Sequence, residues 1–158
     1  MYGGTQKKKR SQHVQGVKAL KATGGNFAFE FDPQTVRIEA ERTDGAMDVV
    51  RVNVIAVVPY FVMKTAAMGR GKSKDAYDLY FLVKHYQAGI DGLAKLFEDY
   101  KDSKIILEMK EKLAEKFASP NHAGPADVAA FLDLDDEEEI AFTKRDACEQ
   151  MQALINMM

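Results

Sequence analysis

The sequence predicts an α+β fold in which an antiparallel three-stranded sheet precedes a bundle of about five helices. Between residues 26 and 58, apolar residues alternate with others at a period of two, which is typical of strands that bury one face. From residue 59 onward, apolar residues recur every three or four positions, which is typical of helices packed on one side. The strands are joined by short turns, so neighbouring strands are expected to run antiparallel.

Length and composition indicate an ordinary globular chain. Its 158 residues match one domain with its own core, and 46% hydrophobic residues with a net charge of -2 are typical of soluble proteins. Cys148 is the single cysteine, so an internal disulfide is excluded and a reducing, cytoplasmic location is expected. The longest apolar run, residues 54–63, is too short to span a bilayer, so we expect no membrane anchor.

Residues 1–22 are expected to form a basic, flexible arm followed by a weak helix. Residues 7–10 are four consecutive cations, which repel one another and offer nothing to bury. Val14, Val17 and Leu20 have weak helical spacing, which the turn residues at 23–26 interrupt. An alternative is that the arm contacts phosphates, which would make the chain a weak nucleic-acid binder.

Residues 23–158 are expected to form a single α+β domain whose sheet occupies residues 26–58. The first strand is predicted where Phe27, Phe29 and Phe31 alternate with other residues. A second strand is predicted up to residue 41, and the Asp44-Gly45 pair favours a hairpin turn into a third strand over residues 47–58. Three strands leave bare edges, so we expect the sheet to pair with further sequence, with another chain or with the helices.

The helices are expected over residues 59–158. Pro59 suits the first turn of one helix, Gly69 ends it, and Ser73 is positioned to cap the next. Further helices are predicted over residues 91–100, 103–117 and 125–132, and the acidic run 133–139 is expected to open a last helix that extends to residue 158. We expect no metal site, because the carboxylates of that run diverge along a helix and His122 has no second ligand at metal spacing.

Lys64 and Asp75 are charged residues on helix faces that are otherwise apolar. Leu79, Leu82 and Tyr86 follow Asp75 at helical spacing, so its carboxylate heads an apolar stripe. An unpaired charge on a buried face is costly, so the two residues are expected to meet each other or a ligand. An alternative for Asp75 is a purely structural role, since the helix dipole favours a carboxylate in the first turn.

Charge is distributed unevenly along the chain. Residues 1–74 carry 13 Lys and Arg against 6 Asp and Glu, whereas residues 75–158 carry 9 against 18. Either the two halves pack together and offset one another, or an anionic ligand binds near the first half. Arg70, Lys72 and Lys74 lie in a glycine-bracketed turn before a helix, which is a favourable place for a phosphate. Asp78 is either a partner of Arg70 at that turn or a surface residue.

Residues 64–82 carry a resemblance to a known family. Lys64 on a helix, the basic turn and the motif Lys74-Asp75-Ala76-Tyr77-Asp78-Leu79 resemble the late motifs of the nucleotidyltransferase-like proteins of the AbiEii/AbiGii abortive-infection toxin group. Residues 117–125, with the helix after them, are more loosely similar to that family. The resemblance implies the later part of a nucleotidyltransferase fold and transfer of a nucleoside monophosphate from a nucleoside triphosphate, with Mg²⁺, to an acceptor hydroxyl. It implies that Lys64 contacts the phosphates and that Asp75 orients the site, with Arg70, Lys72, Lys74 and Asp78 as further nucleotide-binding candidates.

The chain departs from the family upstream of this block. Family members carry a Gly-Ser turn and an Asp-x-Asp pair on an early strand, whereas this chain has no Gly-Ser dipeptide and its only Asp-x-Asp is Asp133-Leu134-Asp135. We therefore expect a nucleotidyltransferase-like protein that is incomplete or inactive on its own, in a toxin–antitoxin or phage-defence setting. Expected partners are a nucleotide and a chain that supplies the missing catalytic half, an antitoxin, or a second copy. The alternative is a noncatalytic interaction or scaffold module in which Lys64 and Asp75 form a structural ion pair.

Overall fold

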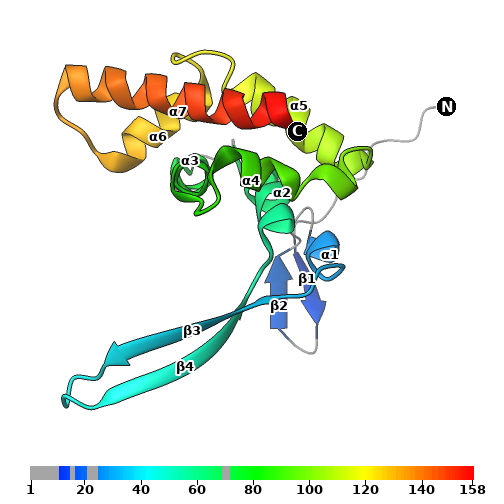
Figure 1. The fold of residues 1–158 in the computed structure, drawn as a ribbon, viewed down its shortest axis with the longest axis vertical. Coiled ribbons are helices and arrows are strands. Elements are labelled where there is room, and N and C mark those ends of the chain that lie inside the picture. The colour runs from blue at the N-terminus through cyan, green and yellow to red at the C-terminus, as the bar shows by residue number, and fades with distance from the viewer. Residues whose placement is uncertain (1–10, 15–16, 21–24, 69–71) are drawn as a thin grey trace.

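A long two-stranded ribbon extends away from a body of packed helices (Figure 1). The computed structural model describes residues 11–14, 17–20, 25–68 and 72–158. The α+β class is confirmed. The elements in chain order are β1 Ser11–Val14, β2 Val17–Leu20, α1 Gly25–Ala28, β3 Gln34–Glu41, β4 Met47–Val54, α2 Val57–Ala67, α3 Lys74–His85, α4 Gly89–Lys95, the 3-10 turn Glu98–Tyr100, α5 Lys104–Lys116, α6 Ala123–Leu132 and α7 Glu137–Met157.

The ribbon is the antiparallel pair β3–β4. Its register runs from Gln34 opposite Val54 to Glu41 opposite Met47. Gly45 has a φ of +83°, a conformation that costs glycine little, and Asp44 accepts a hydrogen bond from the Ala46 amide at 3.1 Å. The Asp-Gly hairpin turn is therefore confirmed.

The predicted three-stranded sheet is wrong, because the segment around Phe27 is not a strand. Residues 25–28 form α1 and a turn follows. Phe27 and Phe31 pack edge to face at 4.9 Å between ring centroids, and both rings contact Tyr100. Positions four apart also share one side of a helical turn, so the spacing that suggested a strand is satisfied equally by this turn. Phe29, between them, is 92% exposed.

Two other elements differ in the structure from what the sequence predicted. The third predicted strand ends at Val54 rather than at residue 58, because the chain turns into α2 at Val57 and buries Val58 in the helical core. The weak helix predicted for residues 11–22 is also wrong, since the described part of that segment forms the paired strands β1 and β2. Val14 and Val17 are β-branched, which favours extended backbone over helix. The cationic residues 7–10 lie outside the described residues.

The helical core is assembled around α7. This 21-residue helix packs against α3, α4, α5 and α6. The largest fully buried side chains are aromatic and aliphatic residues of five helices and the connections after them: Phe61, Leu79, Leu93, Phe97, Ile106, Leu113, Phe117, Met151 and Leu154. No helix within the described residues is long and apolar enough to cross a bilayer.

The predicted helix boundaries are close to the observed ones. Pro59 lies in the first turn of α2, and the segment predicted as one helix over residues 91–100 is α4 followed by a 3-10 turn. Asp136 caps α7 by accepting a hydrogen bond from the Glu139 amide at 2.8 Å, so the acidic run does open the last helix. Ser73 precedes α3 as expected, but its hydroxyl makes no capping hydrogen bond.

Replacing Gly124 in α6 by alanine is expected to destabilise the protein. A Cβ at this position would lie 2.7 Å from ring atoms of the fully buried Phe117. Overpacking of this kind costs about 1–3 kcal/mol of unfolding free energy, which urea denaturation would measure. The cost should shrink in a Phe117→Leu background, because leucine lacks the outer ring atoms. An equal cost in both backgrounds would contradict the steric explanation.

Candidate functional site

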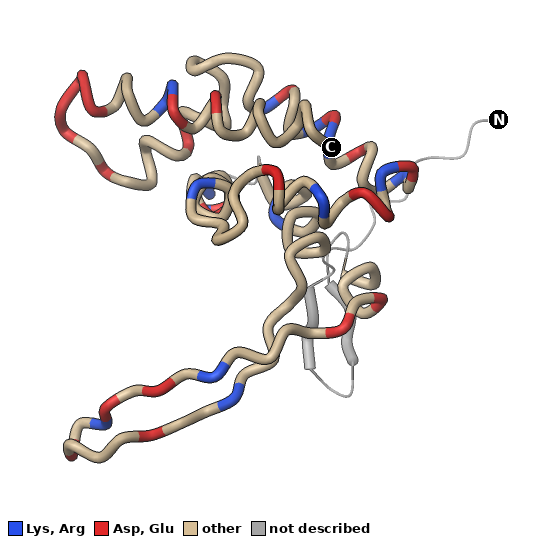
Figure 2. Tube along the Cα trace, viewed as in Figure 1, with Lys and Arg blue, Asp and Glu red and all other residues tan. Residues whose placement is uncertain are grey.

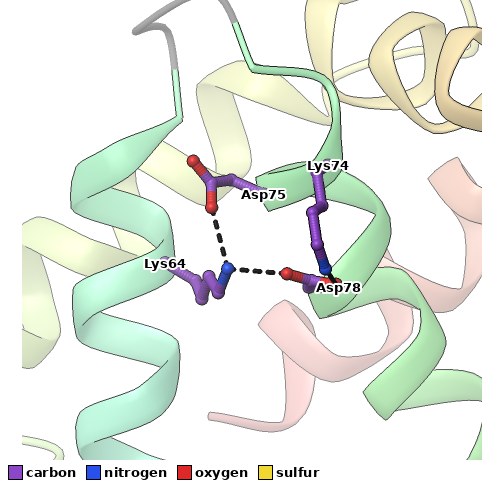
Figure 3. Close-up of polar contacts among 4 residues, drawn as sticks. All are labelled: Lys64, Lys74, Asp75 and Asp78. Carbon is purple, nitrogen blue, oxygen red and sulfur yellow. Dashed lines mark hydrogen bonds and ion pairs between the residues drawn. The ribbon is translucent and has the colours of Figure 1, made fainter.

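Lys64 on α2 meets two carboxylates of α3. Its Nζ donates a hydrogen bond to Asp75 Oδ1 at 2.9 Å and another to Asp78 Oδ2 at 2.6 Å (Figure 3). The prediction that the charges of Lys64 and Asp75 meet is confirmed. Helical geometry explains the arrangement, since Asp75 and Asp78 are three positions apart and therefore share one side of α3.

Asp78 is shared between two lysines. Lys74, four positions earlier on α3, donates to its second carboxylate oxygen at 2.8 Å. The side chains of Lys64, Asp75 and Asp78 are only 24%, 13% and 13% exposed, whereas that of Lys74 is 61% exposed. Asp78 therefore pairs with Lys64 and Lys74 rather than lying free on the surface. Arg70, its other predicted partner, lies outside the described residues.

The hydrogen bonds of this site stabilise the charged forms of Lys64 and Asp78. Burial acts to lower the pKa of Lys64, but the bonds to Asp78 and Asp75 outweigh it and the pKa lies above its ordinary value. Burial likewise acts to raise the pKa of Asp78, but the bonds from Lys64 and Lys74 outweigh it and the pKa lies below its ordinary value. The Lys64 ammonium and the Asp78 carboxylate are therefore both charged near neutral pH.

An aromatic hollow of about 540 Å³ adjoins this cluster. Asp78 is one of its walls, and the remaining lining is mostly apolar: Gln34, Val54, Ile55, Val57, Tyr60, Tyr77, Phe81 and Leu82. The Lys64 Nζ lies 5.8 Å from the Tyr60 ring centroid, within cation–π range. Burial, and then the charge of Asp78, raise the pKa of the Tyr60 phenol. The hollow can therefore hold a flat, apolar group beside charged side chains.

The predicted basic turn is only partly described. Lys72 is exposed just before α3, and its carbonyl accepts a hydrogen bond from the Asp75 amide at 3.4 Å. Lys74 is the first residue of α3 and also lies 5.7 Å from the Phe131 ring centroid. Lys72, Lys74, Asp75 and Asp78 thus share the start of one helix, and Lys64 approaches them from α2.

Comparison of the chain with protein-family models, curated proteins and solved structures finds no match. The resemblance to nucleotidyltransferase-like proteins therefore rests on sequence motifs alone, those of residues 64–82 and, more loosely, of residues 117–125.

The described residues do not offer a site that fits Mg²⁺. No three Asp, Glu, His or Cys side chains among them converge on a common point. Asp78, which lines the hollow, and Asp75 both accept hydrogen bonds from Lys64. Mg²⁺ requires several oxygen ligands in a near-octahedral arrangement, which two lysine-paired carboxylates do not provide. We therefore derive no transfer step from these residues.

Sequence reasoning missed a second ion-pair network, which joins α3 to α7. Lys84 Nζ donates to Asp146 Oδ2 and to the Tyr80 hydroxyl, both at 2.7 Å, and that hydroxyl donates to Asp146 Oδ2 at 2.5 Å. The i,i+4 spacing of Tyr80 and Lys84 is visible in the sequence, but their partner lies more than sixty residues away. Burial acts to raise the pKa of Asp146, and the bonds from Lys84 and Tyr80 outweigh it and lower the pKa.

Asp78→Asn is expected to lower the free energy of unfolding by about 1–3 kcal/mol, because the charged hydrogen bonds from two lysines are lost. Urea denaturation followed by circular dichroism measures the change. The control is Asp102→Asn, an exposed residue in the turn before α5, which should change stability by less than about 0.5 kcal/mol. An equal loss of unfolding free energy in the two variants would show that the ion pairs of Asp78 with Lys64 and Lys74 do not stabilise the fold.

Stability is expected to fall on acidification. The folded-state pKa values of Asp78 and Asp146 lie below their ordinary values, so both groups stabilise the folded chain above the ordinary carboxyl pKa of about 4. That stabilisation is lost as the pH falls through the lowered folded-state values. Denaturation at a series of pH values should show a shallower acid dependence for the Asp78→Asn, Asp146→Asn double variant. An equally steep loss of stability with acid in the unmodified chain and in the double variant would contradict the assignment of this loss to Asp78 and Asp146.

Proposed function

We propose that this chain is a nucleotidyltransferase-like protein that holds a nucleotide and does not transfer it on its own. The observation that carries the proposal is the meeting of Lys64 with Asp75 beside an aromatic hollow, at the residues that resemble the family. In this proposal the nucleobase occupies the hollow against Tyr60, Tyr77 and Phe81, because aromatic rings stack on any base. The phosphates lie toward Lys64, Lys72 and Lys74.

The charge balance at the start of α3 supports an anionic ligand. Lys64, Lys72 and Lys74 carry three positive charges against two negative charges on Asp75 and Asp78, a net charge of +1 before Arg70 is counted. Lys74 keeps Asp78 paired when Lys64 turns to a phosphate, whereas Asp75 gives up its lysine partner in that rearrangement. The helix N-terminus adds a further favourable field for phosphate.

The proposal assigns catalysis to residues outside the described site. Two-metal phosphoryl transfer needs several carboxylate oxygens, and these would come from another polypeptide segment, on the same chain or on a partner. An antitoxin that binds the assembled protein belongs to the same proposal, because the resemblance is to a toxin group. That second segment would also determine which hydroxyl accepts the nucleotide and which nucleotide is used.

A noncatalytic interaction module is the second candidate. It is favoured by the ribbon, in which all sixteen residues of β3 and β4 are exposed. In this function the ion pairs of Lys64 with Asp75 and Asp78 hold α2 against α3 and bind no ligand. The ribbon then forms the contacts with another polypeptide.

Calorimetric titration separates the two functions. We expect heat with at least one of the magnesium complexes of ATP, GTP, CTP and UTP. Lys74→Ala should weaken the binding about threefold to tenfold, the value of one exposed charged contact. Lys95→Ala, which removes an exposed lysine from α4, is the matched control and should leave the affinity unchanged. Absence of heat with all four nucleotides, or equal loss in both variants, would overturn the nucleotide function and favour the interaction module.

A further inference from the structure

A second hollow lies on α7. Its volume is about 440 Å³, and it lies between one side of α7 and the loop that joins α5 to α6. It shares no lining residue with the aromatic hollow beside Lys64. We call it the α7 groove, and its lining residues are Pro120, Asn121, Glu137, Ile140, Ala141, Lys144 and Arg145.

Helical spacing places unlike charges at the two ends of the α7 groove. Glu137, Ile140, Ala141 and Lys144 recur three or four positions apart, so they share one side of the helix. Figure 2 shows the acidic start of α7 and a short basic stretch further along the same helix. Glu137 and Lys144 are separated by about 10 Å along the helix axis, too far to pair with each other. The two aliphatic residues lie between them.

The loop wall of the groove is held in place by α7 itself. Gln152 Nε2 donates hydrogen bonds to the carbonyls of Phe117 and Ala118 at 3.0 and 3.1 Å. The Cys148 thiol donates to the same Phe117 carbonyl at 3.3 Å. These bonds fix the end of α5 against α7 directly before the loop residues that line the groove. The groove is therefore already formed without a ligand.

The cations of the groove have no partner among the described residues. Neither the Lys144 nor the Arg145 side chain makes an ion pair or a hydrogen bond there. This is unexpected from composition, because residues 75–158 carry 18 acidic residues against 9 basic ones. No acidic residue lies three or four positions from Lys144 along α7. Two adjacent cations at the edge of a hollow can therefore receive an anion from outside the chain.

The lining determines which anion fits. Lys144 and Arg145 against Glu137 give the lining a net charge of +1, which one carboxylate balances better than a phosphate dianion does. The fork of an arginine matches a carboxylate with two parallel hydrogen bonds. Ile140 and Ala141 offer an apolar contact beside the charge. A polypeptide that carries an acidic group next to an aliphatic side chain combines these features, and 440 Å³ accommodates a few residues of it.

We propose that the α7 groove binds a short acidic segment of another polypeptide. Its carboxylate lies against Lys144 and Arg145, and an aliphatic side chain next to it packs on Ile140 and Ala141. The carboxylate belongs either to an Asp or Glu side chain or to a free C-terminus, since both present the same group. The proposal is independent of nucleotide binding, because the groove and the aromatic hollow have no residue in common.

A nitrogen-15 NMR titration of the whole chain tests the proposal. The probes are acetyl-Leu-Glu-Leu-amide, acetyl-Leu-Gln-Leu with a free C-terminus, the uncharged acetyl-Leu-Gln-Leu-amide, and inorganic phosphate. Concentrations extend to about 10 mM, because few contacts in an open groove give weak binding. We expect at least one carboxylate peptide to shift the amides of Asn121 and of residues 137–145. It should bind about threefold to tenfold more tightly than the uncharged peptide. A response to only one of the two carboxylate peptides supports the proposal and identifies the source of the carboxylate.

Arg145→Gln supplies the decisive variant. It should weaken binding of the carboxylate peptide about threefold to tenfold and leave the uncharged peptide unaffected. The matched control is Lys95→Gln, which removes an exposed cation of α4 outside the groove. The absence of shifts in the groove with both carboxylate peptides would overturn the proposal. Equal affinity for the charged and uncharged peptides, an equal loss in the two variants, or tighter binding of phosphate than of either carboxylate peptide would overturn it as well.

Discussion

The ammonium of Lys64 between Asp75 and Asp78 is the interaction on which the arrangement of the chain depends. It joins α2 to α3 through groups that would be costly to shield from water singly. The direction of the ribbon is limited by α2, because only Ile55 and Ala56 separate β4 from that helix. The hollow is a consequence of the same geometry, since its walls come from the base of the ribbon, from α2 and from α3.

The same contact limits what the site can do. Lys64 already has two carboxylate partners, so the proposed contact with a phosphate requires Lys64 to leave at least one of them, whereas Lys72 and Lys74 are exposed at the start of α3. The carboxylates are also committed to a cation and are poor metal ligands in this state. The sequence also lacks a Gly-Ser turn and an early Asp-x-Asp pair, so the proposed function is to hold a nucleotide rather than to transfer it.

Sequence reasoning predicted that Lys64 and Asp75 meet, but it misplaced Asp78 and the segment around Phe27. The inward direction of Asp75 followed from its spacing to Leu79, and the pairing with Lys64 followed from the cost of a lone buried charge. Asp78 was predicted to be a partner of Arg70 or a surface residue because it was judged from its own helix alone, whereas the approach of Lys64 from α2 determines its partner. Phe27 and Phe31 were misread because a period of two contains a period of four.

The ribbon shows a different limit of sequence reasoning. Alternation correctly predicted its two faces, but alternation carries no information on what covers the apolar one, and the described residues leave it in water. Gln34 and Val54 lie at the base of the apolar face and also line the hollow in which the nucleotide is proposed to bind. A partner that packs on the base of the ribbon therefore also closes one wall of the hollow. Binding at the ribbon and binding in the hollow are thus coupled through Gln34 and Val54.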